Sequence, residues 1–468
     1  MKRDLLADLR SGKNLSTREM LILTLTLAMP SIIAEVSYLF MSFIDASMVG
    51  SLGANASASV GIVATTTWLL GGIIRSATLG FTVQVAHLYG AENYKEARAV
   101  SLHGVLSVLF IGLGLMTIAL SISSYLPGWL GGQQEIRADA TRYFVIYAFS
   151  LPFMALNNTS GGMLQCSGNM KIPSILNVVS CVLDVIFNFF FIYPSKTIHI
   201  LGQDIMLHRA GMGIRGAALG TTLATMCCAL TMSYFLFIRS KNLKLRREAR
   251  KRFDAKELKT ALQISLPVAF QNILSGGAQI VATGIVAPLG PVAISANSFA
   301  VTTEGFCYMP GYGISAAATT MVGQSIGAGR KKTAKKLGWI CMLSGMVVMT
   351  ITGALMYIFA YHLLGLLSPV NDIKNLGAAV LRIEAFAEPF FAAVIVGEGV
   401  FRGFKDTLGP SIIDFATMWV IRLPLAYVLS RSIGLRGVWV AMCLQLIIAG
   451  IIFLIRMALK NRNLTDLK

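Results

Sequence analysis

The sequence predicts an all-α protein that crosses a membrane about twelve times, in two six-helix lobes related by pseudo-twofold symmetry. Of its 468 residues, 55% are hydrophobic and only 13% are charged, whereas soluble domains average about 25% charged. Apolar runs of about 20 residues, long enough to span the hydrocarbon core as a helix, recur along the chain. The third observation is an internal repeat, in which landmarks of the first half of the sequence recur in the second half.

The predicted spans start after a charged tail, residues 1–18, which has no small-residue cleavage site. We therefore expect no removable signal peptide. Spans one to six would form an N-lobe over residues 19–238, and spans seven to twelve a C-lobe over 258–456. A basic linker, 239–257, would join the lobes, and residues 457–468 would form a tail. The spans are predicted at residues 19–44, 59–83, 100–125, 140–164, 172–194, 216–238, 258–285, 296–322, 337–360, 378–401, 410–432 and 437–456.

The two halves share a set of landmarks in one register. The segment GMLQCSGNMKIP at 162–173 has its counterpart, GVFRGFKDTLGP at 399–410, 237 positions later (399 minus 162). The same offset links three further pairs: Pro30 with Pro267, Leu52-Gly53 with Leu289-Gly290, and Gly90-Ala91 with Gly327-Ala328. Six spans is an even number, so both halves would have the same orientation, as in parallel repeats.

One insertion distinguishes the halves. The GIRG at 213–216 and the GLRG at 434–437 lie only 221 positions apart, so the first half carries 16 extra residues within 194–215. Two interpretations remain open for this segment, a small hairpin that caps one lobe and an unstructured loop.

The distribution of basic residues predicts the orientation in the membrane. Of the 40 Lys and Arg, 29 fall in the two tails and the loops on one side, 8 on the other side, and Arg75, Arg382 and Arg422 within spans. The basic side is expected to be cytoplasmic. Both termini would then lie on the cytoplasmic side of a plasma (inner) membrane. The net charge of +18 is then a consequence of topology. We expect contact with anionic lipid headgroups and no nucleic-acid binding.

Cysteine and histidine patterns point to no metal or redox chemistry. None of the seven Cys forms a CxxC pair, which excludes a disulfide framework or a zinc site by spacing. Of the five His, His87 and His103 lie near a cytoplasmic loop, where a structural role is favoured over titration. No HExxH or GxSxG motif is present, so a membrane hydrolase is not indicated, and we expect neither enzyme activity nor a cofactor.

Acidic residues in spans carry the functional signal. A carboxylate at the bilayer centre costs on the order of 3 kcal/mol, so it usually faces a bundle interior or a wet cavity. Ion coupling is the functional interpretation, and a structural pair with an intramembrane arginine is the alternative. Eight acids lie within or at the edge of predicted spans: Glu35, Asp45, Asp184, Glu304, Glu384, Glu388, Glu398 and Asp414.

Spacing ranks some of these acids. Asp184 and Asn188 are four residues apart, so they share a helix face and could jointly offer oxygens to a cation. Glu384, Glu388 and Glu398 would lie on one face of the tenth span. Pro389 would bend that span and release a backbone carbonyl into a cavity.

Several motifs resemble the multidrug and toxic compound extrusion (MATE) family, and its DinF-like branch more than its NorM-like branch. They are IDASMVGSLG at 44–53, LQCSGNMKIP at 164–173 with FRGFKDTLGP at 401–410, LDVIFNFFFIY at 183–193, and the Gly-Ala then basic loops after the second and eighth spans. The resemblance covers residues 20–456. It implies the MATE/MOP fold of two six-helix lobes around a central cleft, and export by alternating access driven by H⁺ or Na⁺.

The resemblance also implies site residues in the N-lobe. Asp45 matches the first-span aspartate of the family, and Asp184 the fifth-span aspartate of the DinF-like branch. Together they would form a cation-coupling site, able to hold Na⁺, with Asn188 and Thr221 as polar partners. Ser180 stands where archaeal members of the branch have asparagine, which leaves the Na⁺ ligand set open.

In the C-lobe the sequence departs from the NorM-like pattern. Ser275 and Phe391 occupy the positions of that branch's seventh- and tenth-span acids, so a C-lobe cation site of that kind is not expected. Glu304, Glu388 and Glu398 are instead the candidates for a separate acidic or substrate site.

These features predict a monomeric secondary antiporter that exports cationic or amphipathic organic compounds in exchange for H⁺ or Na⁺. Pro30 and Pro267, inside the first span of each lobe, would act as bending points. The alternative is a flippase for a lipid-linked or polyprenyl-type substrate with the same fold. A flippase would need several cationic residues lining its cavity, whereas the spans contain three arginines.

Overall fold

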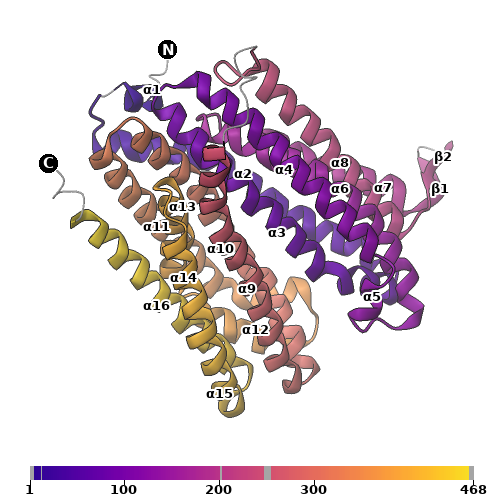
Figure 1. Ribbon diagram of the computed structural model, residues 1–468. Helices are drawn as coiled ribbons and strands as arrows, with labels where there is room; N and C mark the ends of the chain where they lie inside the picture. Colours follow the sequence, from indigo (N-terminus) through magenta and orange to yellow (C-terminus); the bar gives the residue numbers. More distant parts are fainter. Residues whose placement is uncertain (1–4, 12, 201–202, 247–254, 463–468) are drawn as a thin grey trace.

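The computed structural model describes residues 5–11, 13–200, 203–246 and 255–462. Its helices form two bundles, one from each half of the sequence (Figure 1). The bundles come together at the end where α1 and the end of α16 lie, and they diverge toward the end that carries α5 and α15.

In its described part, the first half contains six long helices. The second of its helices begins at a capping box, in which Ser16 and Glu19 satisfy each other's backbone N–H groups at 2.8 and 3.2 Å. The elements are α1 (Leu5–Arg10), α2 (Thr17–Gly50), α3 (Ala54–Gly90), α4 (Tyr94–Ile122), α5 (Leu126–Trp129), α6 (Gln134–Cys166), α7 (Lys171–Ile192), β1 (Pro194–Ile200), β2 (Gln203–Ala210), α8 (Ile214–Tyr234) and the π-helical turn η1 (Phe235–Arg239).

The second half repeats this order with two of its spans divided into shorter helices. Its elements are α9 (Ala255–Val286), the short turn η3 (Ala287–Leu289), α10 (Pro291–Gly327), α11 (Lys331–Leu367), α12 (Asn371–Glu384), α13 (Glu388–Gly403), α14 (Leu408–Ala416), the π-helical turn η4 (Thr417–Arg422), α15 (Leu423–Ile433) and α16 (Leu435–Arg462).

Every predicted span coincides with a helix or a helical run, which confirms the all-α membrane fold. Among the described residues, nine helical runs are long and apolar enough to cross a membrane. The other three predicted spans correspond to α6, α10 and α12–α13, where polar and small residues or a break dilute the apolar run. The helices extend a few residues beyond the predicted ends, because a helix need not stop where the hydrocarbon core does.

The tenth span is broken as its proline predicts. Helix α12 ends at Glu384 and α13 begins at Glu388, with Pro389 in the first turn of α13. Proline has no backbone N–H and its ring clashes with the carbonyl four residues earlier, so a helix bends or breaks there. The break changes the directions of the glutamates on either side.

Backbone geometry repeats at the offset of the sequence landmarks. Residues with positive φ recur 237 positions apart, as Gly53 with Gly290 (111° and 93°), Glu92 with Gly329 (56° and 72°), and Gly168 with Lys405 (95° and 60°). After the insertion, Gly213 and Gly434 (58° and 61°) recur 221 positions apart. Because left-handed turns are rare for residues other than glycine, their recurrence shows that each half folds by the same local rules.

Each half has its own apolar core, and a third core joins them. Phe144 and Leu151 are fully buried in the first half, as is Trp439, to 1% exposure, in the second. The third core packs α1 and the first part of α2 against α10, α11, α13 and α16, around residues such as Leu9 and Phe401. The beginning of α2 is therefore anchored on the C-lobe.

The lobes also meet closely where α3 and α10 end. His87 Nε2 lies 2.7 Å from the Gly403 carbonyl oxygen, and Gln324 donates to the Cys166 carbonyl at 2.7 Å. A Cβ atom on Gly327 would lie 1.9 Å from the His87 carbonyl oxygen. The two helix ends thus touch backbone to backbone and form a seam between the lobes.

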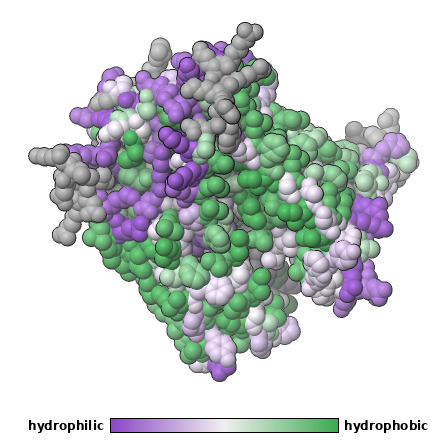
Figure 2. Space-filling model, in the orientation of Figure 1, coloured by the Kyte–Doolittle hydropathy of each residue, from purple (hydrophilic) through white to green (hydrophobic). Residues whose placement is uncertain are grey.

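The surface matches a protein surrounded by lipid. Figure 2 shows a broad hydrophobic belt over both bundles, with hydrophilic residues gathered near the ends. Large apolar side chains are exposed on the helices, among them Phe110 of α4 at 74% and Val420 of η4 at 70%. Such exposure is stable in hydrocarbon and would be a large liability in water.

The insertion of the first half forms a hairpin, so that interpretation replaces the unstructured loop. Strands β1 and β2 pair antiparallel, from Pro194 opposite Ala210 to Ile200 opposite Gln203. Arg209 rests on the rings of Phe189 and Tyr193, at 5.0 and 5.7 Å from their centroids, and fastens the hairpin to the end of α7.

Candidate functional site

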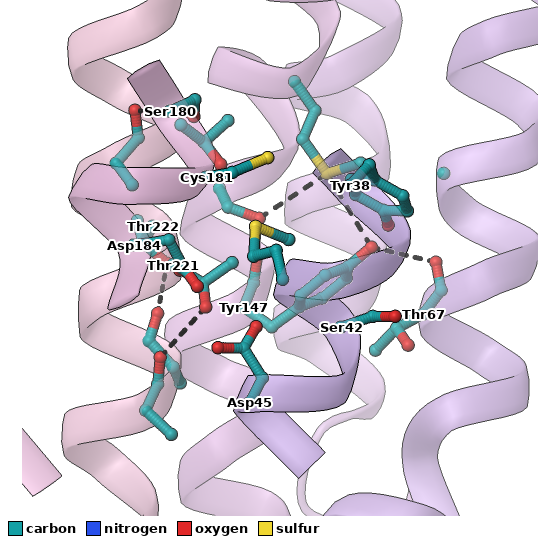
Figure 3. A pocket seen from close by; sticks show the side chains of 18 of the residues that line it. Tyr38, Ser42, Asp45, Thr67, Tyr147, Ser180, Cys181, Asp184, Thr221 and Thr222 are labelled. Atoms are coloured by element: carbon teal, nitrogen blue, oxygen red, sulfur yellow. Dashed lines mark hydrogen bonds between the residues drawn. The ribbon is translucent and has the colours of Figure 1, made fainter. Parts of the chain in front are cut away.

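A cavity of about 780 Å³ lies within the N-lobe. Helices α2, α3, α6, α7 and α8 supply its walls, and Figure 3 shows Asp45, Asp184, Thr221 and Tyr147 among the side chains that line it. This volume is in the range of pockets that hold drug-sized ligands. The cavity is the candidate functional site.

The acids predicted from the first and fifth spans meet at this cavity. Asn188 donates one hydrogen bond to Asp45 Oδ1 at 2.9 Å and one to Asp184 Oδ2 at 3.2 Å. Asp184 and Asn188 are each 1% exposed. The amide holds the two carboxylates together, as expected from the shared helix face of Asp184 and Asn188.

Two oxygens of this group lack hydrogen-bond partners among the described residues. They are Asp184 Oδ1 and Asn188 Oδ1, and both are buried. Thr221, on α8, stands beside Asp184. Buried polar atoms are nearly always satisfied, so unpaired oxygens next to two carboxylates suit a proton or a small hard cation such as Na⁺.

A glycine allows this convergence. A Cβ atom on Gly220 would lie 2.2 Å from Asn188 Oδ1, so α8 approaches α7 closely only because residue 220 has no side chain. Sequence reasoning missed Gly220, although its position next to Thr221 was a usable signal. Ser180, the residue that replaces asparagine, lines the cavity and donates to the Ala224 carbonyl at 3.4 Å.

The rest of the cavity is aromatic and mixed in charge. Tyr147 donates to the Thr67 carbonyl at 2.9 Å, and Trp68 is 47% exposed. Glu35 and Arg75 also line the cavity. Ten residues of α2 separate Glu35 from Asp45, a rise of roughly 15 Å, so these charges lie at a different depth from the aspartates. Spacing alone did not indicate that Arg75 faces the cavity.

Glu398 belongs to a polar chain in the C-lobe. Arg402 donates to Glu398 at 2.5 Å, and Gln271 donates to Glu398 at 2.7 Å and to Asp414 at 3.1 Å. Ser275 also donates to Asp414, at 3.2 Å. Each of the two carboxylates thus accepts hydrogen bonds from two side-chain donors, which indicates a structural role for both.

Glu304, Glu384 and Glu388 form a separate buried cluster. Electrostatic interactions connect the three glutamates, and Arg422 acts on Glu304 and Glu384. All four carboxylate oxygens of Glu384 and Glu388 lack hydrogen-bond partners among the described residues. The expectation was that all three glutamates of the tenth span lie on one face of a single helix. Glu384 instead ends α12, whereas Glu388 and Glu398 lie on α13. Glu398 has hydrogen-bond partners of its own, Arg402 and Gln271.

The prolines, histidines and cysteines named in the sequence lie outside the acid pair of the cavity. Pro30 and Pro267 lie inside α2 and α9, which continue through them, and their role as bending points stays a prediction. His87 and His103 are hydrogen-bonded, the latter to Glu257 at 2.8 Å. The seven cysteines are unpaired, and no group of three or more His, Cys, Asp or Glu among the described residues is arranged to hold a metal ion.

A duplicated bundle that closes at one end and contains a large cavity, lined by aspartates among aromatic and apolar side chains, defines the class, a multi-pass membrane transporter of small molecules. The chain belongs to the MatE family, whose model matches residues 30–190 and 267–428. The two matches start 237 positions apart (267 minus 30), the offset of the landmarks. This assignment confirms the resemblance at the level of the family.

Three relatives illustrate the likeness in sequence. Probable multidrug resistance protein NorM of Thermotoga maritima is 26% identical over 429 residues, 90% of this chain and 88% of that protein. The protein of the same description from Idiomarina loihiensis is 25% identical over 93% of both chains. Multidrug resistance protein MdtK of Yersinia pestis is 23% identical over 92% of this chain and 94% of that protein.

Solved structures support the fold. A MATE protein in the straight conformation superposes with a TM-score of 0.88 at 19% identity, over 100% of both chains. A MATE protein in the bent conformation gives 0.85 at 19% identity, over 100% of this chain and 99% of that one. At this identity the likeness concerns the fold alone.

Proposed function

We propose that the protein is a secondary active antiporter that exports organic compounds in exchange for H⁺ or Na⁺. The observation that carries this proposal is the convergence of Asp45, Asp184 and Asn188 beside a cavity large enough for a drug-sized molecule. The relatives named as multidrug resistance proteins favour an exporter over a flippase and over an enzyme.

The exchange follows from competition for the two carboxylates. When Asp45 and Asp184 are ionised, they attract a cationic substrate into the cavity, and the aromatic walls add apolar contact. Arrival of H⁺ or Na⁺ at the pair neutralises that attraction, and the substrate leaves. Each ligand shifts the balance between the two orientations of the cavity only by its differential affinity for them.

This arrangement favours the DinF-like over the NorM-like pattern. Its acids lie on α2 and α7 of the N-lobe, with Asn188 and Thr221 as further oxygen donors. The cluster of Glu304, Glu384 and Glu388 is proposed as a second acidic site in the C-lobe, because its unpaired buried oxygens need a proton or a cation. Glu398, held by Arg402 and Gln271, fits a structural role better.

We further propose that the protein lies in the plasma membrane, with its basic side facing the cytoplasm and anionic headgroups. Both termini would then be cytoplasmic. The protein would act as a monomer with no cofactor, since one lobe contains a complete cavity. Size-exclusion chromatography with light scattering in a mild detergent would give the mass of a single chain.

Transport by purified protein in liposomes tests the proposal. An imposed pH or Na⁺ gradient should drive uptake of a fluorescent organic cation, and Asp45→Asn and Asp184→Asn should each lower the rate at least ten-fold. Asp139→Asn, which removes an exposed acid paired with Arg142 at 3.4 Å, is the matched control. Wild-type rates in both cavity variants would overturn the proposal.

The same liposomes identify the coupling ion. A Na⁺ gradient without a pH gradient, and then the reverse, should give transport in one arrangement and not in the other. The unpaired oxygens of Asp184 and Asn188 are compatible with either ion.

A further inference from the structure

A short helix, α1, lies at the end of the molecule where the two bundles come together (Figure 1). Leu6 and Leu9, three residues apart, share one face of this helix and are 6% and 0% exposed. An isolated helix of six residues is not stable in water, because so few hydrogen bonds do not offset the cost of nucleation. The order of α1 therefore comes from the surfaces that it packs against.

One of these surfaces belongs to the C-lobe. Leu9 is part of the same apolar core as Phe401. Arg330, at the turn between α10 and α11, donates to the Leu9 carbonyl oxygen at 3.1 Å and to the Lys13 carbonyl oxygen at 2.7 Å. The same guanidinium donates to Asn14 Oδ1 at 2.8 Å. Three hydrogen bonds from one side chain thus fasten α1 and the turn after it to the C-lobe.

The other surface belongs to the N-lobe. Leu6 fills the space beside Gly168, in the turn between α6 and α7, where a Cβ atom on the glycine would lie 2.2 Å from Leu6 Cδ2. The guanidinium of Arg10 lies over the ring of Tyr89, at the end of α3, 5.1 Å from its centroid. Helix α1 therefore contacts both lobes at once.

Arg10 also extends a chain of hydrogen bonds across the seam between the lobes. It donates to Gln324 Oε1 at 3.3 Å, and Gln324 Nε2 donates to the Cys166 carbonyl at 2.7 Å. The bond from Gln324 and the bond between His87 and Gly403 are equivalent in the repeat, because 324 minus 87 and 403 minus 166 are both 237. The two halves thus close on each other symmetrically, and Arg10 reinforces one of the two bonds.

We propose that residues 5–11 and 13–14 form a strap that holds this end of the molecule closed and must leave one lobe before the end can open. A helix of six residues is roughly 9 Å long, so it cannot stay in contact with two lobes that move apart. The strap therefore stabilises the closed arrangement through contacts that the open one lacks. This inference rests on the proposed function, because alternating access requires the lobes to separate at this end in one of the two states.

Double electron–electron resonance measures the distance across this end directly. Spin labels are attached at Lys95→Cys, at the start of α4, and Lys332→Cys, at the start of α11, both of which are exposed positions. The seven native cysteines are replaced by alanine or serine. Wild type is compared with Arg10→Ala and Arg330→Ala in lipid nanodiscs. Arg18→Ala, which removes an exposed arginine at the start of α2, is the matched control.

We expect each strap variant to raise the ratio of the longer to the shorter distance population about ten-fold, because each loses hydrogen bonds from a charged donor. Arg10→Lys should give an intermediate ratio, since lysine keeps the charge over Tyr89 without the planar fork. Arg18→Ala should keep the wild-type distribution. Wild-type distributions in both Arg10→Ala and Arg330→Ala would overturn the inference.

Hydrogen exchange measured by mass spectrometry gives a second readout in protein that keeps its native cysteines. Arg330→Ala should raise exchange at least five-fold in peptides that cover the strap and also in those that cover the seam, residues 87–91 and 324–330. A rise confined to the strap would show that α1 is attached to the seam without holding it closed, and would overturn the inference. Both measurements are made without substrate or gradient, so a failure of wild-type protein to transport would count against the proposed function alone.

Discussion

At the scale of single residues, the acid pair depends on its surroundings as much as on its carboxylates. Asn188 bridges Asp45 and Asp184, and the absence of a side chain at Gly220 lets α8 close over that bridge. An interior packed this densely cannot absorb an added methyl group without moving a neighbour.

Gly220→Ala should therefore disrupt ion coupling. The new Cβ atom would displace Asn188 Oδ1, which lies only 2.2 Å from its position. We expect gradient-driven transport to fall at least ten-fold in liposomes. Gly114→Ala on α4, where nothing lies within 4 Å of the added atom, should transport within two-fold of wild type. Equal activity of the two variants would contradict the packing argument.

The ion pairs of Asp406 stabilise the fold by an amount that depends on pH. Burial raises the pKa of Asp406, but Lys460 at 2.8 Å and Arg456 at 3.0 Å outweigh it and hold this pKa below its usual value. The folded pKa is thus lower than the unfolded one, about 3.9. The stabilisation is complete above the unfolded pKa and disappears as the pH falls through the folded pKa.

Asp406→Asn should therefore lower the free energy of unfolding by about 2 kcal/mol at neutral pH. The difference in Tm between this variant and wild type should be equal at pH 7 and pH 5.5 and should shrink toward pH 3. Asp139→Asn, at an exposed pair, should change Tm little. A difference for Asp406→Asn that persists unchanged at pH 3 would refute this assignment.

At the scale of elements, the contact between the ends of α3 and α10 limits which conformations the lobes can reach. Gly90 and Gly327 are equivalent positions of the repeat. Added Cβ atoms would lie 2.0 Å from the Gln324 carbonyl oxygen and 1.9 Å from the His87 carbonyl oxygen, respectively. The seam is therefore closed by backbone contact that only glycine permits.

Gly327→Ala should weaken this closed seam. Hydrogen exchange measured by mass spectrometry should increase for peptides that contain residues 87–91 and 324–330, because the helix ends can no longer touch. Gly284→Ala on α9, with nothing within 4 Å of the added atom, is the control. Unchanged protection in Gly327→Ala would mean that the seam tolerates the methyl group.

At the scale of the whole molecule, the proposed orientation places both ends of the chain on the basic side. A green fluorescent protein fused to the C-terminus should fluoresce, and alkaline phosphatase fused there should be inactive. Alkaline phosphatase inserted between β1 and β2 should be active, because the hairpin belongs to the opposite side. The reverse pattern would contradict the orientation.

Composition, spacing and family resemblance were enough to predict the class, the duplication and most of the candidate site. Hydropathy and a fixed offset depend on local composition and order, so they predicted every span and the repeat. The four-residue spacing of Asp184 and Asn188 was likewise sufficient to place them on one face. The pairing of Asp45 with Asp184 was predicted only from the resemblance to a family, because local spacing cannot connect residues more than 130 positions apart.

Features that depend on the directions of the helices relative to one another could not be predicted and came from the folded structure. The break between α12 and α13 separated Glu384 from Glu388 and Glu398, although their spacing suited one continuous helix. Packing of α3 against the other walls turned Arg75 into the cavity, and the approach of α8 to α7 made Gly220 essential. Spacing reports position along one helix, whereas the chemistry of a site depends on which helices meet and at what depth.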